Sequence, residues 1–331
     1  MHLQTPYLLF LGDAPDQLAA KVADGISRWR PENCVGQFRM EGCQADCGLE
    51  DISIEEAIKR GAKTLVIGVA NRGGIISEAW LKVLIEAVTA GMDVAAGLHN
   101  KLNDIPELFE AAALHGKYLF DVRHPKEALP IGNGVKRTGK RLLPVGTDCS
   151  VGKMFTALAI EKEMLERDMK ATFRATGQTG ILISGDGISV DAVVADFIAG
   201  AIEKLSPDND EDHWDIIEGQ GSMFHPSYAG VTAGLIHGSQ PDALVLCHEP
   251  TRDHMRGVPD YQLPELKTCM DLNLMMAQRT NPEAKFVGIA INTSKLSDVD
   301  AAMLLADVEA ELGLPTVDPV RNGVARIVDN L

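Results

Sequence analysis

The residues best suited to chemistry lie in one glycine-rich segment, RLLPVGTDCSVGKM at Arg141–Met154. An apolar run leads into Gly146, five residues and Gly152 precede Lys153, and a helical pattern begins directly afterwards. This order predicts a phosphate-binding loop, because glycines allow the tight backbone path, exposed amides surround a phosphate and the lysine adds a positive charge. We expect these residues to bind a phosphate or pyrophosphate group: Gly146, Thr147, Asp148, Cys149, Ser150, Val151, Gly152, Lys153 and Met154.

Met154 departs from the pattern of nucleotide triphosphatases, which have Ser or Thr after the lysine to hold Mg²⁺. A thioether does not serve as a ligand for a hard cation, and Thr156 points to another side of the expected helix. The loop is therefore expected to hold a phosphate that does not react, as in coenzyme A, and no metal is expected.

A second polar segment, DIIEGQGSMFHPSY at Asp215–Tyr228, follows another expected strand. Glu218 ends that strand, and an open α/β sheet places its ligands at the carboxyl ends of its strands. We expect Glu218 to be catalytic, although a purely structural glycine-rich turn is the alternative. The polar groups expected to assist are Gln220, Ser222, His225 and Tyr228.

A third segment, RATGQTGILISGDGISVD at residues 174–191, is expected to form a long exposed loop that closes over a ligand. Arg174 is a candidate partner for a substrate carboxylate, with a structural arginine as the equal alternative. Gln178, Thr179 and Asp186 would complete the site. In the N-terminal part, Arg72 is expected to face a cleft between the domains.

The cysteines point to neither disulfides nor a metal. Six cysteines in 331 residues are too few for a disulfide framework, and the spacing of Cys34, Cys43 and Cys47 is not that of a zinc site. Cys149 lies near a helix start, which would lower its pKa, but a covalent acyl-thiol role is the less favoured reading.

Short apolar runs alternate with helical patterns along the whole chain, which predicts parallel sheets covered by helices on both faces. A segment rich in proline, glycine and charge, residues 123–140, is expected to join two α/β domains, at residues 1–135 and 136–331. The expected strands are 7–11, 64–69, 93–96, 118–122, 141–145, 171–174, 214–217, 243–247 and 286–291. The expected helices are 14–29, 54–60, 77–90, 152–167, 188–204, 228–237, 264–279 and 296–312.

The composition argues against two classes of binding partner. The net charge is −16, whereas a nucleic-acid or acidic-membrane surface needs a basic face. The first residues indicate a strand rather than a signal peptide, and no apolar run is long enough to span a membrane. We expect a cytoplasmic protein with a small-molecule substrate, and an apolar helix face that supports a homo-oligomer.

Four segments together resemble the D-glutamate N-acetyltransferase (DgcN-type) family, long catalogued as a domain of unknown function. They are GTDCSVGKM, RATGQTG, EGQGSMFHPSY and ANRGG, at residues 146–154, 174–180, 218–228 and 70–74. The resemblance extends over nearly the whole chain, and Met154 belongs to that family's loop. It implies a Rossmann-like N-terminal domain and a phosphate-loop C-terminal domain. It also implies acetyl transfer from acetyl-CoA to the amine of a D-amino acid, chiefly D-glutamate, in bacterial D-amino acid catabolism.

A more distant resemblance is to dethiobiotin synthetase, whose GTDxxxGKT loop and Glu-Gly-Ala-Gly-Gly turn are similar to Gly146–Lys153 and Glu218–Gly221. This likeness covers only the C-terminal domain, and Met154 argues against its Mg·ATP chemistry. Two alternatives remain open: an ATP- and Mg²⁺-dependent ligase or kinase of that type, and a non-catalytic nucleotide- or coenzyme A-binding protein.

The mechanism that we expect is direct attack of the substrate amine on the thioester in a ternary complex. A base must first remove a proton from the ammonium group, and Glu218 is the first candidate, with Asp186 and His225 in reserve. Backbone amides at Gln220–Ser222 would stabilise the oxyanion. The substrate carboxylates would bind Arg174 and Arg72.

Overall fold

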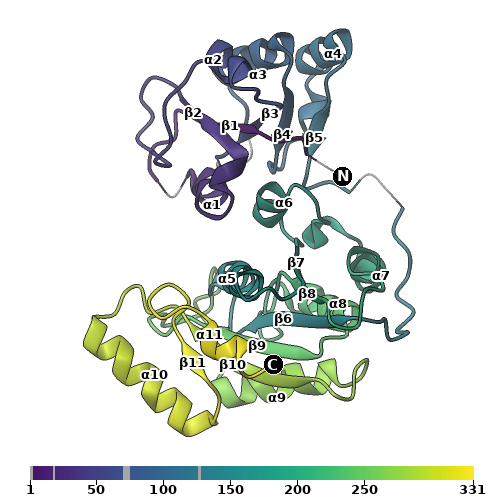
Figure 1. The fold of residues 1–331 in the computed structure, drawn as a ribbon, viewed down its shortest axis with the longest axis vertical. Coiled ribbons are helices and arrows are strands. Elements are labelled where there is room, and N and C mark those ends of the chain that lie inside the picture. The colour runs from purple at the N-terminus through teal and green to yellow at the C-terminus, as the bar shows by residue number, and fades with distance from the viewer. Residues whose placement is uncertain (1–2, 18, 70–74, 126–127) are drawn as a thin grey trace. The chain divides into compact units, whose positions relative to one another are not determined.

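The structure, a computed structural model, describes residues 3–17, 19–69, 75–125 and 128–331 and divides into two compact units. The first unit holds Met1–Lys126 and Gly177–Ala192, and the second holds Glu127–Thr176 and Val193–Leu331. Each unit has one sheet of parallel strands with helices packed against it (Figure 1). The α/β fold class expected from the sequence is confirmed.

The sheet of the first unit has the strand order β2-β1-β3-β4-β5. Its interior strand β1 is a continuous apolar run with every residue buried, as expected for a strand covered on both faces. Helices α2, α3 and α4 line one side of this sheet and α1 the other (Figure 1). The strands are β1 (Tyr7–Gly12), β2 (Cys34–Arg39), β3 (Thr64–Ile67), β4 (Asp93–Ala96) and β5 (Leu119–Asp121). The helices are α1 (Lys21–Trp29), α2 (Ile54–Lys59), α3 (Glu78–Ala90), α4 (Pro106–His115) and α6 (Gln178–Ser184).

Helix α6 corrects the expectation of a long exposed loop at residues 174–191. Its apolar residues Ile181, Leu182 and Ile183 are buried, and it packs against α1 of the first unit. Gly25 of α1 lies so close that a Cβ there would stand 3.3 Å from the Ile183 side chain. The chain thus leaves the second sheet after β7, adds a helix to the first unit and returns, so the units divide differently from the expected boundary after residue 135.

The sheet of the second unit has the order β11-β10-β9-β6-β8-β7, with all neighbours parallel. Helix α5 lies on one face of this sheet and α9 on the other (Figure 1). The strands are β6 (Lys140–Gly146), β7 (Ala171–Arg174), β8 (Trp214–Ile217), β9 (Ala243–His248), β10 (Lys285–Ile291) and β11 (Thr316–Val317). The helices are α5 (Lys153–Glu166), α7 (Ala195–Leu205), α8 (Ala229–Ser239), α9 (Leu266–Ala277), α10 (Asp298–Leu312) and α11 (Ala325–Val328).

Strand β6 occupies the centre of this sheet, between β8 and β9. Because all three strands are parallel, the segments that follow them emerge at one edge of the sheet. The segments after β6, β8 and β9 begin at Thr147, Glu218 and Glu249 respectively. The fold therefore brings these three segments together.

The observed elements differ from the expected ones both in extent and in number. The helix expected at residues 188–204 begins only at Ala195, because a short 3-10 turn, Val190–Ala192, belongs to the first unit. Strand β2 and helix α4 were not expected: β2 is a partly exposed edge strand, CVGQFR, without a continuous apolar run.

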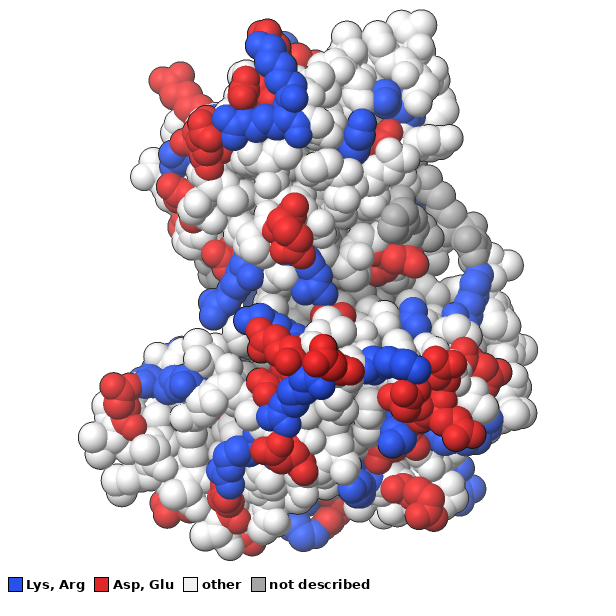
Figure 2. All heavy atoms as spheres, in the orientation of Figure 1, with Lys and Arg blue, Asp and Glu red and all other residues white. Residues whose placement is uncertain are grey.

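Acidic and basic side chains are interspersed on the face drawn in Figure 2, with no extended field of one sign among the described residues shown there. None of the described helices combines the length and apolarity needed to cross a bilayer.

Gly200 of α7 tests the packing of the second unit. A Cβ there would lie 2.0 Å from the carbonyl oxygen of Pro130, where the segment before β6 crosses the helix. We expect Gly200→Ala to lower the free energy of unfolding by about 1–3 kcal/mol in urea denaturation, since a backbone oxygen cannot rotate away.

Gly230→Ala in α8 is the matched control, because nothing lies within 4 Å of its Cβ position. It should be neutral or stabilise by up to about 1 kcal/mol through helix propensity. Equal effects of the two substitutions would contradict this packing.

Candidate functional site

The loop between β6 and α5 has the backbone of an anion-binding cradle. Ser150 and Gly152 are both left-handed, with φ of 55° and 106°. Alternating left- and right-handed residues turn successive amides towards one point, and α5 adds the positive end of its dipole. Ser150 is not a glycine, so its conformation costs about 1–2 kcal/mol, a strain typical of functional loops.

Lys153 lies beneath this loop. Its side chain is buried, and Nζ donates to the carbonyl oxygen of Asp148 at 2.7 Å. Burial lowers the pKa of Lys153, so a phosphate anion beside it would stabilise the charged form. The predicted order of strand, loop and helix is confirmed, and phosphate binding by these residues stays a prediction.

The turn after β8 approaches the lysine closely. A Cβ on Gly219 would lie 1.8 Å from the Pro144 carbonyl oxygen of β6 and 3.0 Å from Cδ of Lys153. Only glycine fits here, so the residue next to Glu218 is fixed against both the strand and the lysine.

Glu218 is buried at this edge of the sheet. Its Oε2 accepts the Thr176 amide at 2.9 Å, and its carbonyl oxygen accepts the Thr176 hydroxyl at 2.6 Å. Gln220 reaches the same hydroxyl with its amide at 3.3 Å. The carboxylate expected to be catalytic is therefore held by the ends of two neighbouring strands, β7 and β8.

Ser222 and Thr147 tie that turn to the phosphate loop. The Ser222 hydroxyl donates to the Thr147 carbonyl oxygen at 3.1 Å, and the Thr147 hydroxyl lies 2.9 Å from Nδ1 of His248. Burial lowers the pKa of His248 to about 4, helped by the charge of Arg252 and opposed by Glu249. His248 is thus a neutral partner of the loop at physiological pH.

Arg252, which sequence reasoning missed, contacts the loop most extensively. Its guanidinium donates to Asp148 and to the carbonyl oxygens of Cys149 and Ser150, and its Nε donates to Glu249. Arg256 adds its backbone amide to Asp148 and its guanidinium to the Ser150 hydroxyl. The available signal was the polar run HEPTRDHMRG directly after an apolar strand.

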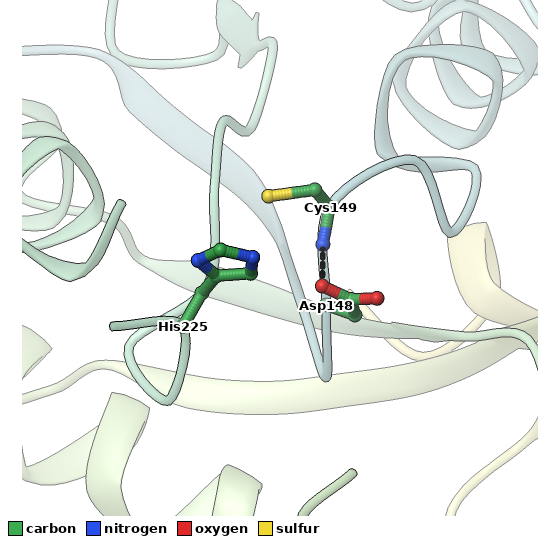
Figure 3. Close-up of side chains that lie close together, drawn as sticks. All are labelled: Asp148, Cys149 and His225. Carbon is green, nitrogen blue, oxygen red and sulfur yellow. Dashed lines mark hydrogen bonds between the residues drawn. The ribbon is translucent and has the colours of Figure 1, made fainter. Parts of the chain in front are cut away.

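Asp148, Cys149 and His225 lie side by side, with their possible metal-ligand atoms all within 4.8 Å (Figure 3). His225 accepts the Ser227 amide at Nδ1, 3.1 Å away, so Nε2 carries the proton and donates to the Arg256 carbonyl oxygen at 3.0 Å. Both ring nitrogens are engaged, which suits neither a metal ligand nor a base. The ring packs against Tyr228, with centroids 4.5 Å apart.

The lower pKa expected for Cys149 from the nearby helix start is not found. Burial raises the pKa of Cys149, and the charge of Lys153 opposes that shift without reversing it. A helix start alone therefore does not produce a thiolate here.

Arg174 is also placed differently from the expectation. Its Nε donates to the buried Asp215 at 2.8 Å, and Asp215 pairs with Thr172, two residues earlier on β7. The guanidinium thus reaches back along the sheet, away from the strand ends, and the structural alternative describes it better.

The remaining expected site residues lie elsewhere. Gln178, Thr179 and Asp186 belong to the first unit, where Gln178 packs against Gly97 after β4. Arg72 lies outside the described residues. Met154 is half-buried at the start of α5, and Thr156 faces Cys247 of β9 at 3.5 Å.

Comparisons with known proteins agree with this architecture. Residues 130–328 match a family model described as domain of unknown function (DUF1611_C) P-loop domain, and residues 38–125 match the model of the DUF1611_N Rossmann-like domain. A Tritonibacter scottomollicae protein named D-glutamate N-acetyltransferase is 61% identical over 99% of both chains. A Pseudoalteromonas sp protein of the same name is 51% identical over 100% of both. The crystal structure of a DUF1611 family protein from Anabaena variabilis ATCC 29413 covers 99% of both chains, with a TM-score of 0.85 and 32% identity.

The low pKa of His248 predicts a pH-dependent stability. Between pH 6.5 and 4 the unfolded histidine binds a proton and the folded one does not, so this group's stabilisation is complete above pH 6.5 and is lost as pH falls towards 4. The loss is at most about 3 kcal/mol. His248→Gln should flatten the unfolding free energy across this range in urea titrations.

His115→Gln, at an exposed position in α4, is the control and should leave the wild-type slope unchanged. Parallel pH profiles of wild type and His248→Gln would contradict a neutral, buried His248.

Proposed function

The chain belongs to the DUF1611 family, and from that membership and the geometry of its phosphate loop we propose that it transfers the acetyl group of acetyl-CoA to the amine of D-glutamate. Transfer to D-glutamate rests on the two curated relatives, both named D-glutamate N-acetyltransferase and aligned with this chain over at least 99% of its length. The protein is an N-acetyltransferase.

The single observation that supports coenzyme A as the donor is the phosphate loop with Met154 at the position of the magnesium-binding hydroxyl. Coenzyme A offers phosphate groups that are bound but not cleaved, so the loop needs amides and Lys153 rather than a metal-held triphosphate. Lys153 and the amides at the start of α5 would hold such a phosphate.

We assign the general base to Glu218. The ammonium group of an amino acid must lose a proton before it attacks a thioester carbonyl. His225 has both nitrogens engaged and Asp186 is exposed, whereas Glu218 is buried next to the glycine that packs against Lys153 of the phosphate loop. One ammonium proton passes to the Glu218 carboxylate, and the amine nitrogen then bonds to the thioester carbonyl carbon. The C–S bond breaks as the tetrahedral intermediate collapses, and the second proton of the nitrogen goes to the departing coenzyme A thiolate.

The turn after Glu218 supplies the oxyanion donors in this mechanism. Gly221 is left-handed, with φ of 66°, and a Cβ there would meet the Thr232 hydroxyl at 2.6 Å. The turn is therefore rigid, and preorganised amides at Gln220–Ser222 would stabilise the tetrahedral oxyanion. Ser222 belongs to this turn and Tyr228 follows it, and both are proposed contacts to the amino acid.

Location and assembly are part of the same proposal. The six cysteines are free thiols, which suits the reducing cytoplasm, and a homo-oligomer remains the expected assembly. Neither the location nor the oligomeric state affects the proposed reaction.

The proposed function is tested by thiol release from acetyl-CoA with a panel of D- and L-amino acids, with and without Mg²⁺. Coenzyme A should appear with D-glutamate and the rate should not depend on a chelator. No release with any amine, together with Mg²⁺-dependent ADP formation from ATP, would instead establish a ligase or kinase.

Glu218→Gln tests the base, because the amide is isosteric and its oxygen still accepts the Thr176 amide. We expect kcat to fall by about 10²–10⁴-fold, with KM for acetyl-CoA within about twofold of wild type. Glu211→Gln, in the exposed loop before β8, should leave kcat unchanged. Turnover of Glu218→Gln near the wild-type rate would remove Glu218 as the base.

A further inference from the structure

Arg252 occupies an oxygen cage beside the phosphate loop. Its Nη1 lies 2.6 Å from Oδ2 of Asp148 and 2.7 Å from the Cys149 carbonyl oxygen, and its Nη2 lies 2.7 Å from that of Ser150. Its Nε lies 2.5 Å from Oε2 of Glu249. Four oxygens, two of them from carboxylates, thus surround one guanidinium.

This set of acceptors is the kind that hard divalent cations take in proteins, namely carboxylate and carbonyl oxygens. Its position corresponds to a metal position as well, because Asp148 belongs to the loop after β6 and Glu249 directly follows the adjacent parallel strand β9. Nucleotide-hydrolysing phosphate loops hold Mg²⁺ with the hydroxyl after the lysine and an acidic residue near the end of a neighbouring strand.

The charges of the cage are already balanced. The Asp148 and Glu249 carboxylates are almost fully buried, at 0% and 5% side-chain exposure, and therefore require cationic partners. Arg252 contacts both, and Nζ of Lys295 lies 3.6 Å from Glu249. Although burial raises the pKa of Glu249, hydrogen bonds from Thr251 and Arg252 lower it overall, so the carboxylate is charged.

Resting on the proposed function, we infer that the Arg252 guanidinium is a built-in cation that takes the place of a divalent metal and positions the phosphate loop. A dication entering the cage would meet the guanidinium, and the residue after Lys153 is the thioether Met154 rather than a hydroxyl that could hold a hard cation. Arg252 is thus a positioning residue with a consequence for specificity: the loop accepts the phosphates of coenzyme A without a metal and disfavours Mg²⁺-bound nucleoside triphosphates.

Arg252→Ala in the full-length protein tests this inference, with coenzyme A binding followed by calorimetry in EDTA and Mn²⁺ binding by electron paramagnetic resonance. The wild type should bind coenzyme A equally with and without EDTA and take up no Mn²⁺ at the loop. The variant should bind coenzyme A at least about tenfold more weakly in EDTA. It should also gain one Mn²⁺ site from the exposed oxygens, and Mn²⁺ should restore part of the affinity.

Arg321→Ala is the matched control. Arg321 also contacts a loop of the same unit, donating to the carbonyl oxygens of Thr293 and Leu296 after β10 and pairing with Asp298. Its removal should cost stability without creating a Mn²⁺ site or changing coenzyme A affinity. Arg252→Lys, which keeps the charge but loses the fork of donors, should fall between wild type and Arg252→Ala.

Three results would overturn the inference: unchanged coenzyme A affinity of Arg252→Ala in EDTA, weakened affinity without any gain of Mn²⁺, or a wild type that needs a divalent cation to bind coenzyme A. Measuring whether the wild type needs a divalent cation to bind coenzyme A tests the inference even if Arg252→Ala does not fold. A wild type that binds no coenzyme A under any condition would instead contradict the proposed function.

Discussion

The second unit is built around one requirement: the amides of the loop after β6 must stay converged on a point above a buried lysine. A lysine without solvent needs an anion or an acceptor, and here the Asp148 carbonyl oxygen provides it at 2.7 Å. Asp148 is in turn fixed through its side chain by Arg252. The central position of β6, the glycine at 219 and the polar segment after β9 all follow from keeping this loop in shape.

Because the loop after β6 must keep its shape, the groups proposed for the reaction come from segments at the ends of three different strands. In the proposed site, the segment after β6 holds the phosphate, the segment after β8 supplies the carboxylate of Glu218, and the segment after β9 supplies the guanidinium of Arg252. Acyl transfer needs a bound donor, a base and oxyanion donors, but no bond at the phosphate breaks. A phosphate loop that binds without hydrolysing is therefore compatible with an acetyltransferase.

The sequence predicted those features that depend on local pattern. Glycine spacing and an apolar run were sufficient for the phosphate loop, because strand, loop and helix are continuous there. Helix α6 was missed because Gly177, Gly180 and Gly185 surround a short apolar run that only the first unit buries. Arg252 was missed for a similar reason: its acceptors Asp148 and Cys149 lie about a hundred residues earlier, and no local pattern links them. For Arg174 the sequence left a substrate role and a structural role equally open, since its partner Asp215 is likewise distant in the chain.

The most direct test of the whole account is a crystal structure of the protein with coenzyme A and N-acetyl-D-glutamate. The account predicts a coenzyme A phosphate within hydrogen-bonding distance of Nζ of Lys153 and of the amides at the start of α5. It also predicts the acetylated nitrogen beside Glu218. A coenzyme A molecule bound with its phosphates away from Gly146–Lys153 would contradict it.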